Sequence, residues 1–214
     1  MHFTFSTFFL AFSATQVAAE AQGITPHEQY SSSIGVLGCK INTNRVAYWP
    51  MSPSCDNICV RVSYNGRSVD LLRIDQSGGG YDISYAAYSY LMTGQSAKDH
   101  PITGGAVSMD IQTVGVENCL GTMNGGKLAL SAPNSMNFVS NCITNQPNSW
   151  VARNYQLFNI QDPVCHYGYD EVCSLNLATS NQPSCPHQLG STGGRLPDTV
   201  FNIQYGTGKA VPAP

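Results

Sequence analysis

The chain has 214 residues, of which only 11% are charged, and 20 are glycine. Ordinary globular proteins carry about 25% charged residues, so a chain rich in Gly, Ser, Asn, Thr and Pro favours short strands and long loops. The net charge of −3 provides no basic surface, which argues against a nucleic-acid partner.

The first element that the sequence predicts is a signal peptide over residues 1–19. Residues 2–12 (HFTFSTFFLAF) are apolar except for Thr and Ser, but too few to span a bilayer, which needs about 20 apolar residues. The segment 17–19 (Val-Ala-Ala) has the small–x–small pattern of a signal-peptidase site, so we expect cleavage after Ala19, with Ala21 as the alternative. These features predict a secreted, extracellular protein that is not anchored in a membrane.

Eight cysteines follow the predicted cleavage site, and an even number in an oxidising compartment predicts up to four disulfide bonds. They are Cys39, Cys55, Cys59, Cys119, Cys142, Cys165, Cys173 and Cys185. No Cys-x-x-Cys pair occurs, and His166 has no partner at metal-ligand spacing. We therefore expect neither a metal nor a cofactor.

The segment 20–33 is polar and featureless, and we expect a flexible leader there. A strand over 58–64 then alternates with period two, and a second β-branched run follows at 67–74. The two runs are joined by Asn65-Gly66, which predicts a hairpin with a type I′ turn.

After the hairpin, Gly78-Gly79-Gly80 interrupts the sheet, and residues 84–92 (SYAAYSYLM) predict a short helix. Ser84 is a suitable N-cap for this helix, and Thr93-Gly94 is a suitable end. A further strand is expected over 106–114, with Val107, Met109 and Ile111 on one face.

Beyond Gly121 the pattern is weaker, with short apolar pieces at 128–130, 155–160 and 200–203 between Asn, Pro and Ser clusters. Four cysteines fall in this half, which favours pairing among themselves. Of the three possible pairings we prefer Cys165–Cys173 with Cys142–Cys185. The Pro- and Ala-rich tail 210–214 is expected to be disordered.

The stretch from the hairpin to the helix resembles the double-psi β-barrel proteins, which include cerato-platanins, barwins, kiwellins, expansins and rare lipoprotein A. In these proteins a hairpin strand ends near an Asp or Asn, and a Gly-rich loop and an aromatic-Asp-hydrophobic-Ser pattern then precede an Ala-rich helix. Here the corresponding segments are 73–75 (Arg-Ile-Asp), 78–80 (Gly-Gly-Gly), 81–84 (Tyr-Asp-Ile-Ser) and 85–88 (Tyr-Ala-Ala-Tyr).

The cysteine layout is most similar to that of cerato-platanins, and the resemblance covers about 90 residues. It implies a mainly β fold, a six-stranded double-psi β-barrel with a short helix over 34–121, followed by a disulfide-bonded C-terminal extension over 122–214. It also implies the bonds Cys39–Cys55 and Cys59–Cys119.

The resemblance further singles out two carboxylates. Asp82 stands where expansins and family-45 endoglucanases keep an acidic residue, and Asp75 resembles the Asp of lytic rare lipoprotein A domains. Glycoside hydrolysis usually needs two carboxylates, but Pro50 stands where the endoglucanases carry their base, and proline cannot deprotonate water. Asp75 and Asp82 are the only catalytic candidates, and we expect the protein to bind its ligand without catalysis.

Aromatic rings near these carboxylates suit sugar rings, because Tyr and Trp combine an apolar face with a hydrogen-bonding group. The candidate carbohydrate-binding residues are Asp75, Tyr81, Asp82, Tyr48 and Trp49. The predicted function is binding of a chitin- or glucan-like cell-wall polysaccharide by a monomer, in the cerato-platanin or expansin manner, with a role as an effector or elicitor. One alternative is a wall-loosening or wall-degrading enzyme, a glycoside hydrolase or lytic transglycosylase, with Asp82 as its acid. The other is an effector that binds a host protein.

Overall fold

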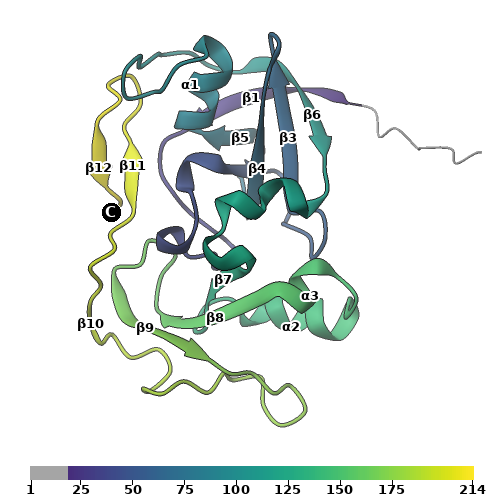
Figure 1. The fold of residues 1–214 in the computed structure, drawn as a ribbon, viewed down its shortest axis with the longest axis vertical. Helices are drawn as coiled ribbons and strands as arrows, with labels where there is room; N and C mark the ends of the chain where they lie inside the picture. The colour runs from purple at the N-terminus through teal and green to yellow at the C-terminus, as the bar shows by residue number, and fades with distance from the viewer. Residues whose placement is uncertain (1–18) are drawn as a thin grey trace, which may run out of the picture.

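Six strands close into a barrel in the order β1-β5-β2-β4-β3-β6 in the computed structural model, which describes residues 19–214 (Figure 1). Their bounds are Glu20–His27 for β1, Val46–Trp49 for β2, Cys59–Tyr64 for β3, Arg67–Gln76 for β4, Tyr81–Ser84 for β5 and Val107–Thr113 for β6. The predicted mainly β fold with a six-stranded barrel is confirmed. The predicted signal peptide lies outside the described residues, except for Ala19.

The hairpin of β3 and β4 has the predicted turn. Asn65 and Gly66 both have positive φ, 48° and 76°, as a type I′ turn requires. Helix α1 spans Tyr85–Thr93 and ends at Gly94, whose φ of 77° is left-handed. The Ser84 hydroxyl does not cap this helix, because it donates to the carbonyl of Asn44 instead.

The prediction of a flexible leader over 20–33 was wrong, because Glu20–His27 forms strand β1 of the barrel. This strand runs parallel to β5 and antiparallel to β6, and it joins the two. Only Ile24 among its residues is buried, at 0% exposed, so the strand lacks the apolar alternation that sequence patterns detect. The barrel begins at β1 and not at residue 34.

A second sheet lies below the barrel in the view of Figure 1, in the order β10-β9-β8-β7. Its strands are β7 (Leu128–Ser131), β8 (Tyr155–Ile160), β9 (Tyr167–Cys173) and β10 (Gly194–Arg195), and helices α2 (Met136–Asn145) and α3 (Trp150–Asn154) accompany it. Four 3-10 helices, η1 (Gly38–Lys40), η2 (Thr43–Arg45), η3 (Val116–Thr122) and η4 (Asn124–Gly126), lie in the connections. Within residues 19–214 no helix has the length and apolar content that a bilayer crossing needs.

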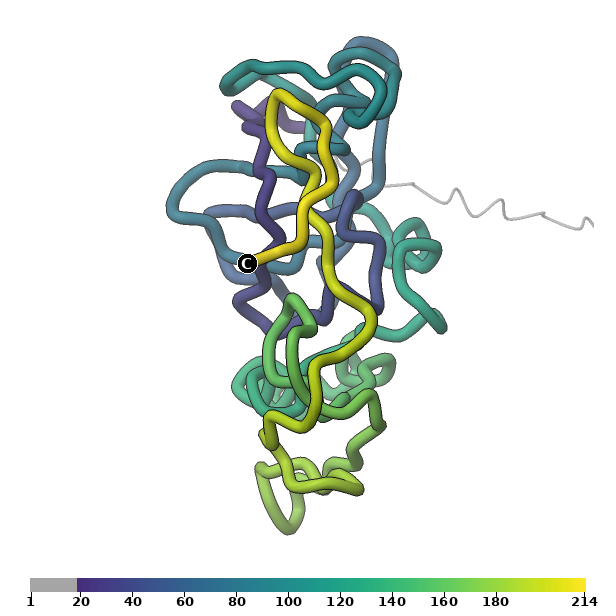
Figure 2. Tube along the Cα trace, turned by 90° about the vertical axis from the view of Figure 1, so that its left-hand side faces the viewer, coloured from purple at the N-terminus to yellow at the C-terminus, as the bar shows by residue number. Residues whose placement is uncertain are grey.

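The last part of the chain runs back along the outside of the barrel and ends in a hairpin of β11 (Phe201–Ile203) and β12 (Ala210–Pro212) (Figure 2). The expectation that the tail 210–214 is disordered was therefore wrong. Ala213 is 4% exposed, and its N–H donates to the carbonyl of Val200 at 2.8 Å. Tertiary contacts order this tail despite its composition.

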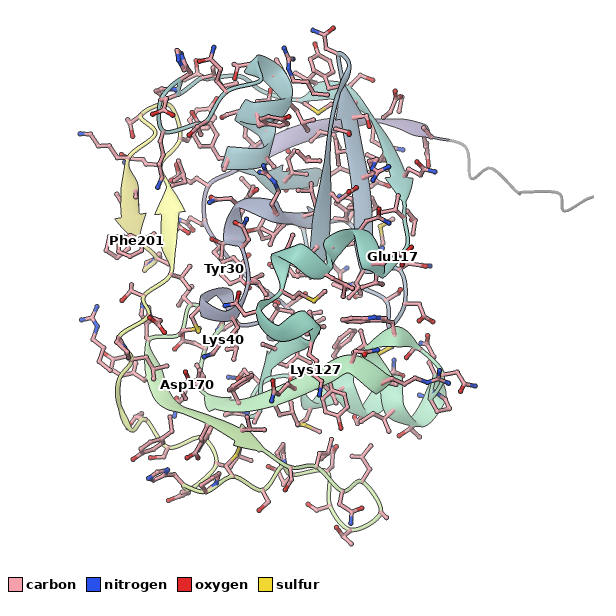
Figure 3. The ribbon with its side chains drawn as sticks, viewed as in Figure 1. Tyr30, Lys40, Glu117, Lys127, Asp170 and Phe201 are labelled. Carbon is pink, nitrogen blue, oxygen red and sulfur yellow. A yellow bond between two sulfur atoms is a disulfide. The ribbon has the colours of Figure 1, made fainter. Side chains whose placement is uncertain are left out.

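The barrel and the second sheet share one hydrophobic core. Leu72 and Ile74 of β4 belong to the same buried cluster as Leu130 of β7 and Leu157 of β8. The ion pair between Lys40 and Asp170, at 2.6 Å, also joins the two parts (Figure 3). The C-terminal region is therefore packed against the barrel and does not form a separable half.

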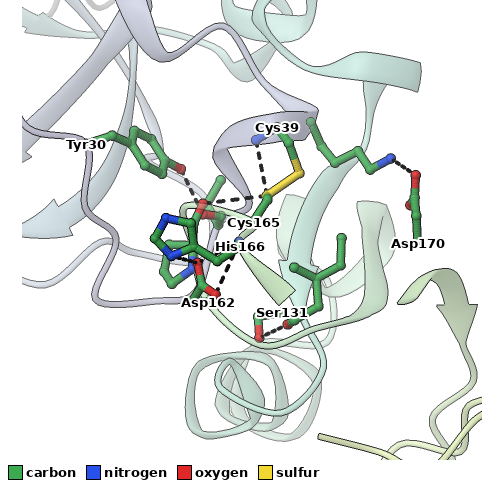
Figure 4. The surroundings of a disulfide bond; sticks show 11 residues. Tyr30, Cys39, Ser131, Asp162, Cys165, His166 and Asp170 are labelled. Carbon is green, nitrogen blue, oxygen red and sulfur yellow. Dashed lines mark hydrogen bonds and ion pairs between the residues drawn. A yellow bond between two sulfur atoms is a disulfide. The ribbon is translucent and has the colours of Figure 1, made fainter. Parts of the chain in front are cut away.

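The disulfides also join the C-terminal region to the barrel. The four bonds are Cys39–Cys165, Cys55–Cys142, Cys59–Cys119 and Cys173–Cys185. Of the predicted bonds, Cys59–Cys119 is confirmed, whereas Cys39–Cys55, Cys142–Cys185 and Cys165–Cys173 were wrong. The reason is that the second sheet packs under the barrel, which brings Cys165 to Cys39 (Figure 4) and Cys142 to Cys55.

Candidate functional site

The register of four barrel strands aligns a row of polar side chains. Thr25 of β1 pairs with Asp82 of β5, Asp82 pairs with Tyr48 of β2, and Tyr48 pairs with Asp75 of β4. Directly paired residues project from the same face of a sheet, so these four side chains lie side by side. We call them the Asp82 row. Ala47 and Trp49, the neighbours of Tyr48 in sequence, belong to the barrel's own core on the opposite face.

Asp82 is half-buried and keeps an open acceptor. The hydroxyl of Thr25 donates to its Oδ1, and no donor within residues 19–214 bonds its Oδ2. A Cβ added at Gly80 would lie 3.2 Å from Asp82 Oδ1, so glycine at the end of the Gly-rich loop leaves room for the carboxylate. The free oxygen can accept a hydrogen bond from a ligand hydroxyl.

Asp75 has a different role. It accepts hydrogen bonds from the Ser31 hydroxyl, from the backbone N–H of Ser33 at 2.8 Å and from that of Gln76 at 2.8 Å. These bonds fasten the segment after β1 to the end of β4. Asp75 therefore serves as an internal anchor, with its oxygens occupied by protein donors.

Tyr48 lies between the two carboxylates and is 3% exposed. The ring of His27 packs against it with the centroids 4.6 Å apart. Burial, and then the negative charge of Asp75, raise the pKa of Tyr48 well above its ordinary value, so the phenol stays neutral. Since its ring is covered by protein, it offers no stacking face to a sugar.

The structure does not bring Trp49 and Tyr81 to the Asp82 row. Tyr81 pairs with Ile24 and faces the barrel's core, one position out of phase with Asp82. Trp49 is 5% exposed and lies edge-on to Tyr81 at 5.2 Å, with the Arg73 guanidinium 5.4 Å from its ring. Of these two rings, Tyr81 is half-buried and Trp49 is buried.

An open hollow of about 560 Å³ borders the row at Thr25. It lies beyond the last β1–β6 pair, Ile24 with Val107. The remaining lining residues are Pro26, His27, Glu28, Gln29, Gly104, Gly105 and Tyr205. The hydroxyl of Tyr205 donates to the carbonyl of Gly104 at 2.6 Å, which ties the C-terminal segment to this hollow.

Thr25, His27 and Tyr205 are the site residues that sequence reasoning missed. Thr25 and His27 lie in the segment predicted as a flexible leader, and Tyr205 lies in the half of the chain where the sequence pattern is weak. The one local signal for a strand was the β-branched pair Ile24-Thr25. Across residues 19–214 no three side chains among His, Cys, Asp and Glu are grouped closely enough to hold a metal ion.

Residues 24–122 match the family model of cerato-platanin. The match begins in β1 and ends with η3, so it coincides with the barrel. No curated protein matches the chain. Cerato-platanins are secreted, cell-wall-associated proteins, and four disulfides are consistent with an extracellular protein. The barrel of residues 24–122 thus fits the cerato-platanin family of double-psi β-barrel proteins.

Proposed function

We propose that the protein binds a chitin- or glucan-like cell-wall polysaccharide through the Asp82 row and does not cleave it. The observation that carries the proposal is the half-buried Asp82, which is held by Thr25 through one oxygen and has no donor from residues 19–214 at the other. A carboxylate fixed in this way accepts hydrogen bonds from sugar hydroxyls. The hollow beside Thr25 gives a polysaccharide chain room to approach.

The geometry favours binding over hydrolysis. Asp75 and Asp82 are separated by strand β2, and two strand spacings put their backbones roughly 10 Å apart. Tyr48 stands between them, and the oxygens of Asp75 are bonded to the segment 31–33. A glycosidase needs its second carboxylate free to act on water or on the sugar.

We expect Asp82→Asn to leave the protein folded and to weaken polysaccharide binding. The amide keeps the size of the side chain but loses the charge and one acceptor, which costs about 1.5–3 kcal/mol where the hydrogen bond is charge-assisted. Binding would be measured by depletion from solution onto insoluble chitin, cellulose and β-glucan, and folding by thermal melting.

Two variants serve as controls. Thr25→Val removes the donor to Asp82 but keeps the carboxylate, so it should lower the melting temperature more than the affinity. Asp110→Asn makes the same charge change at an exposed position of β6 and should alter neither. If Asp82→Asn lowers the melting temperature and leaves binding intact, Asp82 is only a structural anchor. Release of soluble sugar by the unmodified protein, abolished by Asp82→Asn, would instead establish the enzyme alternative.

A further inference from the structure

Arg45 is a half-buried arginine without a carboxylate partner in the described part of the chain. It ends η2, and its guanidinium carbon lies 5.7 Å from the ring centroid of Tyr90 on α1. Its Nη1 donates to the carbonyl of Asn44 at 3.1 Å, which leaves Nε and Nη2 without a protein acceptor in residues 19–214. Burial lowers the pKa of this guanidinium, as expected for a charge that is partly withdrawn from water.

Two other arginines of the barrel, Arg67 and Arg73, are used differently. Arg67 donates to the carbonyls of Leu91 and Met92 at the end of α1, and Arg73 donates to the carbonyls of Met51 and Ser52. Both side chains thus serve the fold. Arg45 spends only one of its five N–H groups in this way.

An open hollow of about 390 Å³ lies in front of Arg45. It is lined by Asn42, Asn44, Arg45, Ala86, Tyr90, Gly94, Ser96 and Ala97, none of which is acidic. The side-chain oxygen of Asn42 accepts from the N–H of Asn44, and the hydroxyl oxygen of Ser96 accepts from the N–H of Lys98. The Asn42 amide nitrogen and the Ser96 O–H therefore remain as donors beside the guanidinium.

We infer that this hollow binds the carboxylate of a uronic acid residue in an acidic polysaccharide. The planar guanidinium matches a carboxylate with two parallel hydrogen bonds, and the neutral donors of Asn42 and Ser96 suit the hydroxyls of the same sugar. One cation fits a ligand group of one negative charge. An acidic peptide tract has no ring hydroxyls for these two neutral donors, and a phosphate monoester carries up to two negative charges against one cation.

The site is separate from the Asp82 row, with which it shares no residue. An experiment can therefore refute the uronic acid site at Arg45 without refuting the binding of neutral polysaccharide by the Asp82 row, and the reverse. A protein of net charge −3 repels an acidic polymer overall, so binding of such a polymer requires a local unpaired cation of this kind.

The test is titration with trigalacturonate and with its methyl ester, which keeps the rings but removes the charges. We expect the unmodified protein to bind only the acid, and Arg45→Gln to weaken that binding by roughly tenfold or more. The matched control is Arg195→Gln, because Arg195 is exposed and remote on β10 and should not affect binding. Chitin depletion should be the same in all three proteins.

A second measurement uses the unmodified protein, so it does not require that any variant folds. In the unmodified protein, the Nε–H resonance of Arg45 should shift on addition of trigalacturonate, and that of Arg195 should not. The inference is overturned if the Arg45 resonance does not move, if Arg45→Gln binds as well as the unmodified protein, or if the methyl ester binds equally. Binding of a short oligoglutamate peptide as tight as that of trigalacturonate would overturn the assignment to a sugar.

Discussion

Replacing Cys39 and Cys165 together by alanine is expected to lower the free energy of unfolding by about 4 kcal/mol. The Cys55–Cys142 bond lies within the loop between Cys39 and Cys165 and shortens it. The segments 39–55 and 142–165 remain in that loop, roughly 40 residues in total. In the chain-entropy description, closing a loop of this length lowers the conformational entropy of the unfolded chain and thereby stabilises the folded protein by about 4 kcal/mol. The measurement is equilibrium unfolding in guanidinium without reductant.

The two tryptophans allow each part of the molecule to be followed separately, since Trp49 lies in the barrel and Trp150 begins α3 beside the second sheet. Because the hydrophobic core is shared, both should report one transition in the unmodified protein. Removal of Cys173–Cys185, which closes a short loop within the C-terminal region, provides the comparison and should cost about 3 kcal/mol. A loss below about 1 kcal/mol for the Cys39–Cys165 variant would show that core packing and the remaining Cys55–Cys142 bond constrain the two parts without it.

The elements that the sequence predicted correctly carry their signals locally. The β3–β4 hairpin is encoded by Asn65-Gly66, whose positive φ angles few other residue pairs adopt so readily. Helix α1 is ended by the left-handed Gly94. In both cases the decisive interaction joins residues only a few positions apart.

The elements that the sequence did not reveal depend on partners far along the chain. Strand β1 exists because β5 and β6 flank it, although only Ile24 is buried in it. The bonds of Cys39 and Cys55 depend on how the second sheet packs under the barrel, which no spacing of cysteines specifies.

The candidate site was only partly predictable for a related reason. Asp75, Asp82 and Tyr48 were identified from the sequence, but the alignment of Asp75 with Tyr48 results from a register shift between β2 and β4. Ala47 pairs with Arg73, and the next residue, Tyr48, pairs with Asp75, so Ile74 is skipped. One residue of slip changes the face to which side chains project, and a slip of this kind leaves no mark in a sequence pattern.

The second sheet has its own point of sensitivity at Gly168, where β9 meets the irregular pairing of β8. Gly168 has a φ of 133°, and a Cβ there would lie 2.4 Å from the carbonyl oxygen of Asn159 and 2.8 Å from the Cα of Ile160. Both atoms belong to the backbone, so they cannot rotate away as a flexible side chain would. We expect Gly168→Ala to lower the free energy of unfolding by about 3–5 kcal/mol, from backbone strain together with displacement of the neighbouring strand.

Gly125→Ala is the matched control for this change. Gly125 also has a positive φ, 77°, but a Cβ there would meet nothing within 4 Å. Its replacement should therefore cost only about 1 kcal/mol, the strain of a left-handed alanine. In urea unfolding of the two variants, the difference reports the steric contact of β9 with β8 together with the larger backbone strain of alanine at a φ of 133°. Equal losses would mean that the strands move apart at no cost, and the tight β8–β9 pairing would then contribute nothing to stability.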